Sequence, residues 1–226
     1  MKKTALAFML AIGFFASLKA APFQFFCPKI QVDPRVVSEF ILLRRIAQSD
    51  KRYPTFRYAL DQLVKRNLKI IVETGTARNG ERNCIGDGCS TVIWSNWAKA
   101  FDGYVYSVDI DPNAVHQSKE ACHCDLSNAV FVCSDSVSFL QNFGKRIDLL
   151  YLDSYDYDPE NPDPSQLHHL KEIMAAYPCL HEESIILIDD CGLPGGGKGK
   201  LVIEFLLERG WKIAMSGYQV IMVYND

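Results

Sequence analysis

The sequence predicts an α/β fold built on a doubly wound sheet that is mostly parallel and has an antiparallel last strand. After residue 69, short apolar segments alternate with segments of helical periodicity, which is typical of a parallel sheet with helices on both faces. Segments 149–152 and 185–188 are apolar throughout, as expected for strands buried on both sides. Segments 211–215 and 220–224 are joined by only four residues. Because this connection is too short for a crossover, the last strand must turn back antiparallel.

Two helices are expected before the sheet. Residues 34–48 carry apolar side chains such as Val36 and Phe40 at mixed helical spacing, and residues 55–66 place Phe56 on an apolar stripe. We expect this N-terminal helical segment, residues 22–68, to cover the edge of the sheet or a pocket beside it. The sheet domain then occupies residues 69–226.

Signals for the ends of helices punctuate the sheet domain. Ser90 or Thr91 is expected to cap its first helix, Pro112 stands in the first turn of the second, and Gly210 ends the last. The expected strands are residues 69–74, 104–109, 130–133, 147–153 and 184–189, followed by the terminal pair. The expected helices are residues 90–101, 112–121, 136–142, 164–177 and 199–209.

The first residues have the pattern of a secretory signal. Lys2 and Lys3 precede an apolar run, and small residues stand before Pro22. We expect residues 1–21 to be a signal peptide and the protein to be exported, either periplasmic or secreted. Leu18 occupies a position where cleavage prefers a small residue, so the alternative is an uncleaved anchor that holds the protein on the membrane, facing the cytosol. Only through such an N-terminus would the chain contact a membrane.

The amino-acid composition limits the classes of partner that the protein can have. The 226 residues suit one sizeable domain, with 48% hydrophobic and 23% charged residues. A net charge of −3 without a basic run argues against nucleic acid as the main partner. We expect a small-molecule substrate, and the oligomeric state stays open. Among the eight cysteines, Cys84 and Cys89 are the favoured local disulfide pair, because export permits disulfides.

Carboxylates end every parallel strand of the predicted sheet. Ligands of open α/β sheets bind outside the carboxyl ends of the strands, so these side chains should surround one site. A tight glycine turn follows the first strand, where backbone N–H groups can approach a ligand. The carboxylates at or just after the strand ends are Glu73, Asp109, Asp135, Asp153, Asp189 and Asp190.

Three of these acids are candidate metal ligands. Asp153, Asp189 and Asp190 would offer the hard oxygen donors that Mg²⁺ prefers. The alternative is an acidic cluster that is salt-bridged to Lys198 or Lys200. Both lysines belong to the glycine-rich segment 191–200, which is either a mobile lid over the substrate or a plain surface loop.

Two further side chains are candidates for proton transfer. Asp156 lies in the loop after the fourth strand, beside the expected site. His168 is next to His169 in a helix, so only one of the two can face any given site. We take Asp153, Asp156 and His168 as the candidate catalytic residues.

The chain resembles the class I S-adenosylmethionine-dependent methyltransferases, which have a Rossmann-like sheet. The resemblance lies in the segment from Glu73 to Gly80, Glu-Thr-Gly-Thr-Ala-Arg-Asn-Gly, in Asp109 and Asp153, and in the reversed last strand. The resemblance covers residue 69 to the C-terminus, which makes 69–226 a methyltransferase-like domain. It implies cofactor binding by a set of residues around the glycine loop and the next two strand ends: Glu73, Gly75, Thr76 and Gly80 near the methionine part, Asp109 on the ribose hydroxyls and Asp135 near the adenine amino group.

Within this class, the chain resembles the small O-methyltransferases related to macrolide-sugar and cephalosporin-tailoring enzymes. That branch implies Mg²⁺ on Asp153, Asp189 and Asp190. It carries a histidine where this chain has Asp156, which leaves the general base open. Residues 81–89 look like an insertion, so either Gly80 or Gly88 could be the last glycine of the cofactor loop.

The expected activity is methyl transfer from S-adenosylmethionine, and an oxygen atom is the favoured acceptor. Alternatives are a non-catalytic nucleoside-binding or interaction module and an NAD-dependent oxidoreductase; the pattern Gly-x-Gly-x-x-Gly is absent after Glu73, which disfavours the latter. Export conflicts with a cofactor that is made in the cytosol. An anchor facing the cytosol, secretion into a host that supplies the cofactor, or loss of methyl transfer would each resolve the conflict.

Overall fold

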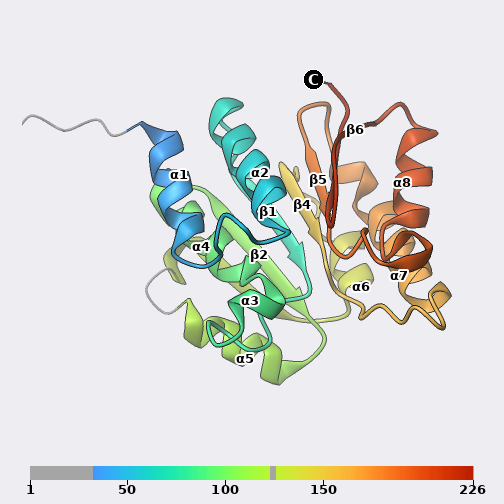
Figure 1. The fold of residues 1–226 in the computed structure, drawn as a ribbon, viewed down its shortest axis with the longest axis horizontal. Coiled ribbons are helices and arrows are strands. Elements are labelled where there is room, and N and C mark those ends of the chain that lie inside the picture. The colour runs from blue at the N-terminus through green and yellow to red at the C-terminus, as the bar shows by residue number, and fades with distance from the viewer. Residues whose placement is uncertain (1–32, 123–125, 226) are drawn as a thin grey trace, which may run out of the picture. The chain divides into compact units, whose positions relative to one another are not determined.

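The structure is a computed structural model that describes residues 33–122 and 126–225. Within these residues, a seven-stranded sheet forms the centre of the fold (Figure 1). The strand order is β3-β2-β1-β4-β5-β7-β6. Strands β1 to β5 pair in parallel, and β7 is antiparallel to both β5 and β6. The strands are β1 (Ile70–Thr74), β2 (Tyr104–Asp109), β3 (Ala129–Cys133), β4 (Leu149–Leu152), β5 (Ile185–Ile188), β6 (Lys212–Ser216) and β7 (Val220–Val223).

The helices alternate with the parallel strands, as the sequence predicted. The predicted bounds of α4 and α5 agree with the observed ones, whereas α1 ends five residues before the predicted end at residue 48. A short helix in the predicted insertion, α3, was not expected. The helices are α1 (Pro34–Leu43), α2 (Tyr53–Lys65), α3 (Cys84–Asp87), α4 (Ser90–Phe101), α5 (Pro112–Ala121), α6 (Ser136–Gln141), α7 (Asp163–Ala176) and α8 (Lys200–Leu207), with short 3-10 turns η1 (Leu126–Asn128), η2 (Tyr177–Cys179) and η3 (Pro194–Gly196).

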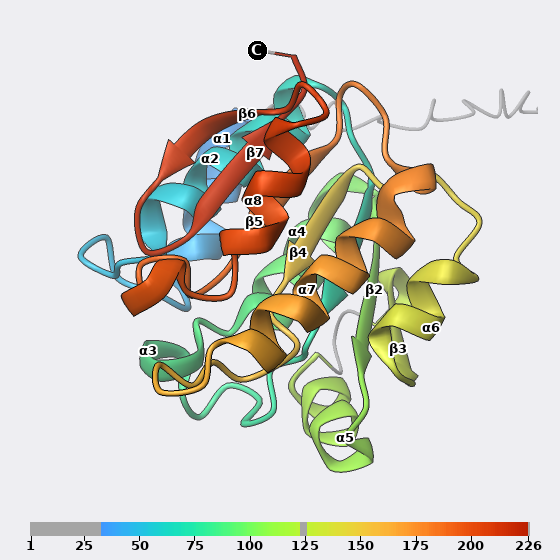
Figure 2. The ribbon, with the colours of Figure 1, turned by 90° about the vertical axis from the view of Figure 1, so that its right-hand side faces the viewer.

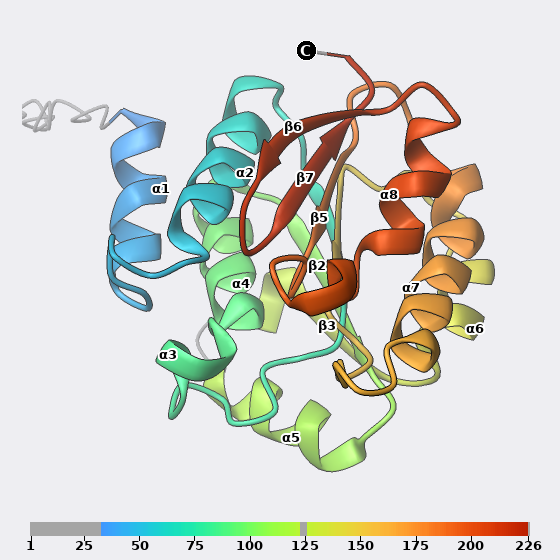
Figure 3. The same cartoon turned by 45° about the vertical axis from the view of Figure 1, so that its right-hand side comes forward.

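Each face of the sheet carries its own hydrophobic core, because successive strand residues point to opposite faces. Tyr151 and Leu187 face α1, α2 and α4, whereas Leu150 and Ile186 face α6, α7 and α8. Figures 1 and 3 show the two helix layers on opposite sides of the sheet, and Figure 2 looks onto the side of α6, α7 and α8. The observed architecture confirms the predicted doubly wound sheet with its reversed last strand.

The start of α4 differs from the prediction. Cys89, not Ser90 or Thr91, is the N-cap residue, and it has a positive φ of 49°. The hydroxyl groups of Ser90 and Thr91 instead donate to the buried carboxylate of Glu73. The two predicted capping residues therefore serve a buried acid rather than the end of the helix.

The predicted signal peptide, residues 1–21, lies outside the described residues. Residues 33–68 of the predicted N-terminal helical segment pack on the sheet, with Leu42 of α1 and Phe56 of α2 in the same core as Tyr151. Within residues 33–122 and 126–225, none of the helices has the length and hydrophobicity that a membrane span requires.

Candidate functional site

Two adjoining cavities lie at the carboxyl ends of the parallel strands, where the sequence places its acids. The first has a volume of about 390 Å³ and a largely charged lining, which includes Arg52, Asp153 and Lys198. The second has a volume of about 300 Å³ and a more apolar lining. The residues common to both linings are Gly75, Asp109, Ile110 and Ser154.

The glycine turn after β1 passes directly against the backbone that follows β4. Gly75 has a φ of +79°, and a Cβ atom there would lie 2.3 Å from the carbonyl oxygen of Asp153. No side chain fits into that space, and only glycine adopts this backbone conformation at low cost. The turn therefore brings its backbone to the wall shared by the two cavities, as the predicted cofactor role of Gly75 requires.

Asp109 fastens the same turn. Its Oδ2 accepts a hydrogen bond from the backbone N–H of Thr76 at 3.1 Å, and its Oδ1 accepts one from the N–H of Asp111 at 2.9 Å. The carboxylate lines both cavities. Thr76 lines the first cavity. The structure thus places the predicted cofactor residues Gly75, Thr76 and Asp109 side by side.

Glu73 is fully buried behind the wall of the first cavity. Its carboxylate accepts hydrogen bonds from Ser90, Thr91 and Ser107 at 2.5–2.7 Å. Burial raises the pKa of Glu73 to about 7, against the effect of these donors. Ser90 lines the cavity and separates Glu73 from it, so the carboxylate supports the wall from behind and does not itself line the cavity.

Gly80 lies away from both cavity linings. Its φ is +57°, and a Cβ atom there would meet Ala121 and Gln117 of α5 at 3.3 Å. The glycine nearest to the start of α4 is Gly88, in the αL conformation at the end of α3. The predicted cofactor contact of Gly80 is therefore not among the contacts that the structure places at the site.

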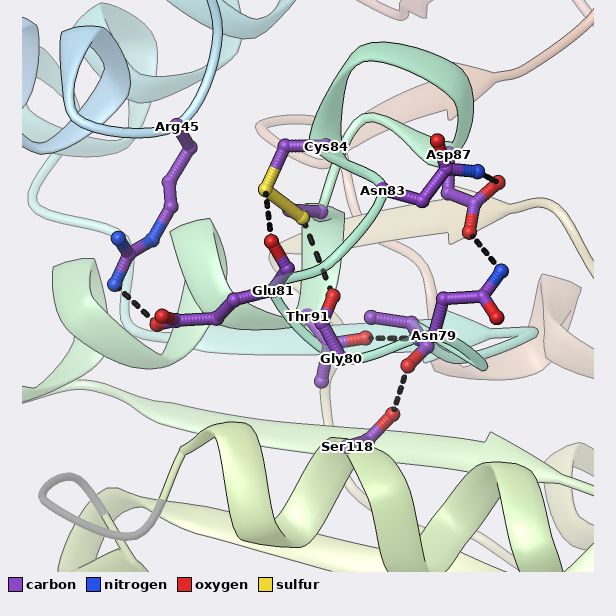
Figure 4. The surroundings of a disulfide bond; sticks show 11 residues. Arg45, Asn79, Gly80, Glu81, Asn83, Cys84, Asp87, Thr91 and Ser118 are labelled. Atoms are coloured by element: carbon purple, nitrogen blue, oxygen red, sulfur yellow. Dashed lines mark hydrogen bonds and ion pairs between the residues drawn. A yellow bond between two sulfur atoms is a disulfide. The ribbon is translucent and has the colours of Figure 1, made fainter.

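The predicted insertion, residues 81–89, closes on itself and contributes to the site. Cys84 and Cys89 form the predicted disulfide, and the Nδ2 of Asn79 donates to Asp87 at 2.7 Å (Figure 4). Gly86 and Asp87 line the first cavity. The sequence marked this segment as extra but gave no sign that it would form a wall of the site.

Asp135 caps α6 at the far side of the second cavity. Its carboxylate accepts the backbone N–H of Ser138 at 2.8 Å, which holds the pKa of Asp135 below its usual value. Val108, Ile110 and Tyr155 supply apolar surface to the same cavity. The second cavity thus combines apolar walls with two carboxylates, those of Asp109 and Asp135.

His168 lines the second cavity and not the first. Its Nε2 lies 3.0 Å from the hydroxyl of Ser136 and 3.4 Å from the buried carboxylate of Glu172, and the hydrogen bond with Glu172 raises the pKa of His168. The neighbouring His169 is buried, with its Nδ1 2.7 Å from the carbonyl oxygen of Ser165. The structure therefore does not bring the predicted catalytic His168 together with Asp153.

Asp156 lines the first cavity but is held by Arg78. Two hydrogen bonds of 2.6 and 3.0 Å join the guanidinium to the carboxylate. This contact lowers the pKa of Asp156 and makes it a weaker proton acceptor. Arg78 belongs to the glycine loop, so the pair connects the loops after β1 and β4 at the mouth of the cavity.

Asp153, Asp189 and Asp190 converge as predicted. One carboxylate oxygen from each lies within 4.8 Å of the other two. We call these three residues the acidic cluster. Asp153 and Asp190 line the first cavity, whereas Asp189 is 1% exposed and lies beneath them.

Two cations from distant parts of the chain neutralise the acidic cluster. The Lys198 ammonium lies 2.5 Å from Asp153 Oδ1 and 3.1 Å from Asp190 Oδ2. The Nε of Arg52 in the loop before α2 donates to Asp189 Oδ2 at 3.0 Å. Lys198 was one of the two lysines expected to pair with these acids, but nothing near Arg52 in the sequence pointed to this site.

The pKa values in the acidic cluster follow from burial and these cations. Burial raises the pKa of Asp153 to about 8, against the effect of Lys198. Although burial opposes it, the Lys198 ammonium and the Tyr218 hydroxyl hold the pKa of Asp190 below its usual value. Tyr218 comes from the β6–β7 turn and lines the first cavity; no sequence motif indicated it.

The predicted Mg²⁺ site can be tested against this geometry. The three carboxylates are suitable donors for Mg²⁺. However, the Lys198 ammonium already lies among their oxygens, and Arg52 contacts the third carboxylate. The arrangement therefore fits an internal cation and does not fit a metal ion at the same position.

Comparisons with known proteins give structural neighbours only. No family model matches the chain, and no curated protein is significantly similar to it. The methyltransferase PaMTH1 of Podospora anserina, solved with S-adenosylhomocysteine, has a TM-score of 0.52 at 16% identity over 86% of this chain and 89% of that one. A methyltransferase from Geobacter sulfurreducens has a TM-score of 0.50 at 16% identity, over 85% of this chain and 88% of that one.

A further neighbour is larger than this chain. The MycE methyltransferase of the mycinamycin biosynthetic pathway, solved with Mg, S-adenosylhomocysteine and mycinamycin VI, has a TM-score of 0.57 at 13% identity. The match covers 85% of this chain but 53% of MycE, so the chain spans about half of that protein. At these identities the likeness concerns the fold: the chain has the Rossmann-like fold of the class I methyltransferases.

Proposed function

We propose that the chain is an S-adenosylmethionine-dependent methyltransferase that acts on an oxygen atom of a small molecule. The observation that carries the proposal is the position of Asp109, which lines both the apolar and the charged cavity. A nucleoside needs this combination, with apolar surface for the base and a carboxylate for the ribose hydroxyls. The fold shared with proteins solved with S-adenosylhomocysteine supports it.

The residues present fit the cofactor. The second cavity, with Val108 and Tyr155 as apolar walls and Asp135 as a carboxylate, would hold the adenine. Asp109 would accept hydrogen bonds from the ribose, and the backbone at Gly75 would border the methionine part. S-adenosylmethionine supplies an electrophilic methyl group on its sulfonium sulfur.

The charged cavity would hold the methyl acceptor. Lys198 and Tyr218 are donors that line it; Lys198 contacts Asp153 and Asp190, and Tyr218 contacts Asp190. We assign the role of proton acceptor to Asp153, because burial raises its pKa to about 8, whereas Arg78 lowers the pKa of Asp156 and His168 lines the other cavity. Orientation of the acceptor and the fixed charges around it would supply most of the rate.

Calorimetric titration tests the cofactor. We expect the protein to bind S-adenosylmethionine and S-adenosylhomocysteine and to give no heat with NAD. Binding of NAD alone would replace the proposal with the oxidoreductase alternative. Binding of S-adenosylhomocysteine without transfer to any oxygen compound in a substrate panel would favour a non-catalytic nucleoside-binding module.

The Asp109→Asn variant tests the residue that carries the proposal. Loss of a charge-assisted hydrogen bond to the ribose should weaken S-adenosylhomocysteine binding by about 1–3 kcal/mol. Asp102→Asn is the matched control, since Asp102 is exposed beyond the opposite end of β2 and asparagine tolerates its positive φ of 54°. Equal affinity of the two variants would remove Asp109 from the site.

We also propose that residues 1–21 direct export or serve as an anchor. The disulfide between Cys84 and Cys89 supports export, because disulfides persist in oxidising compartments and not in the cytosol that an anchored chain would face. N-terminal sequencing of the protein recovered from membrane and soluble fractions tests this: a chain that begins at residue 22 indicates cleavage, and an intact membrane-bound chain indicates an anchor. An intact chain in the soluble fraction would contradict both.

A further inference from the structure

Lys198 is an unusual residue for its position, because its ammonium is buried inside a group of acids. The side chain is 2% exposed and contacts Asp153 and Asp190 at 2.5 and 3.1 Å. Its neighbour two residues along, Lys200, is exposed. A buried ammonium requires paired charges of this kind, since it loses its hydration.

The loop that carries Lys198 is fixed in place. A Cβ atom on Gly197 would lie 1.7 Å from the Asp190 carbonyl oxygen, and one on Gly199 would lie 2.4 Å from the sulfur of Cys191. Glycine on both sides therefore lets the loop backbone press against the end of β5. The side chain of Gln166 in α7 adds hydrogen bonds to the carbonyl oxygens of Gly195 and Gly197, at 3.2 and 3.0 Å. The lysine is thus delivered to the cluster by a packed loop.

Every carboxylate of the acidic cluster has at least one donor, and Asp153 and Asp190 share Lys198. Asp153 has Lys198, Asp190 has Lys198 and the hydroxyl of Tyr218, and Asp189 has Arg52 and the hydroxyl of Tyr151. Three carboxyl groups thus face two cations, Lys198 and Arg52. A divalent ion bound by these oxygens would lie roughly 2.1 Å from them, in the space that the Lys198 ammonium occupies.

We propose that Lys198 takes the place of a divalent metal ion in this site, so that the protein binds its ligands and acts without Mg²⁺. An ammonium has three N–H donors, and Asp153 and Asp190 accept two of them. The third can hold an oxygen of a molecule in the charged cavity, which Lys198 lines. Activity without Mg²⁺ rests on the proposed function, whereas the inability of the acidic cluster to bind a divalent metal ion does not.

The test is metal binding by protein pretreated with EDTA and freed of it. Mn²⁺ and Mg²⁺ are titrated by calorimetry into the full-length wild type, Lys198→Met and Lys200→Met. We expect no stoichiometric binding to the wild type or to Lys200→Met at millimolar concentrations. Lys198→Met should bind Mn²⁺ about tenfold more tightly or better, because a positive charge within about 4 Å of the carboxylates is gone. If Lys198→Met does not fold, Lys198→Arg replaces it and should bind no metal.

One Mn²⁺ bound per wild-type chain at micromolar concentration would overturn the proposal. So would a wild type that loses S-adenosylhomocysteine binding in EDTA and regains it with Mg²⁺. A wild type that binds neither metal nor S-adenosylhomocysteine would count against the proposed function and leave the assignment of Lys198 in place. Failure of the Lys198 assignment and failure of the proposed function therefore give different results in these titrations.

Discussion

At the scale of single residues, the site is set by how carboxylates are surrounded. Three carboxylates end or directly follow strands, yet their surroundings differ. Glu73 is buried among hydroxyl groups, Asp109 accepts a hydrogen bond from the glycine turn, and Asp153 contacts Lys198. The same residue type therefore has three different roles at one edge of the sheet. Burial and nearby charges decide which of them can titrate near neutral pH.

Glu73 should make stability depend on pH. Its pKa is about 7 in the folded protein, above the ordinary carboxyl value of 4.5, so the folded state holds the proton more tightly than the unfolded state. Its contribution is fully present below pH 4.5 and is lost as the pH rises through 7. We expect wild-type stability to fall relative to Glu73→Gln by roughly 2–3 kcal/mol between pH 5 and pH 8.

Urea unfolding of both proteins across this pH range measures the difference. The comparison with Glu73→Gln cancels groups that titrate in both proteins. A difference that stays constant with pH would mean that Glu73 remains ionised in the folded state, and that its three hydroxyl donors outweigh burial.

At the scale of elements, the segment between β1 and α4 shows how an insertion becomes part of a site. Residues 81–89 form α3 and close a disulfide loop, and Gly86 and Asp87 reach the charged cavity. Arg45 holds the other side of the segment through Glu81 at 2.5 Å (Figure 4). The segment is thus attached at both ends and lines the same cavity as the glycine turn.

The Cys84→Ser/Cys89→Ser variant should lower the free energy of unfolding by about 2 kcal/mol, the value expected for a loop of this size. Because the segment forms a wall of the cavity, affinity for S-adenosylhomocysteine should fall as well. Cys133→Ser is the control, since Cys133 is an exposed free thiol. Urea unfolding and calorimetry measure both effects, and dithiothreitol should reproduce them in the wild type and in Cys133→Ser, which both contain the disulfide, but not add to them in the double variant. If both variants behave alike, the disulfide supports neither stability nor the site.

At the scale of the whole molecule, the N-terminal helices and the sheet share a core and are joined by charged contacts, of which that between Arg52 and Asp189 is buried. The rings of Phe56, Trp94 and Tyr151 pack with centroids 4.9–5.8 Å apart and join α2, α4 and β4. Directly beside them, Arg52 contacts Asp189 from 137 positions away in the sequence. The N-terminal segment therefore completes both the core and the charge balance of the acidic cluster.

The Arg52→Met variant should be destabilised by about 3–5 kcal/mol, because it leaves Asp189 buried without its cation. Arg57→Met, in the helix α2 that follows Arg52, is the matched control. Its ion pairs with Glu39 and Asp61 are about one-third exposed, so about 0–1 kcal/mol should be lost. Chemical denaturation measures both, and a similar small loss in each would show that the Arg52 contact is weak in solution.

The amino-acid sequence was sufficient to determine the order of strands and helices along the chain, the antiparallel direction of the last strand and the presence of acids at the strand ends. These follow from periodicity and connection length, which are properties of neighbouring residues. Tertiary structure alone decided that Lys198 enters the acidic cluster, that Glu73 is buried behind Ser90 and that His168 lines the apolar cavity. Such contacts join residues that are distant in the chain, as Lys198 and Asp153 are at 45 positions apart, and only the packing of the layers brings them together.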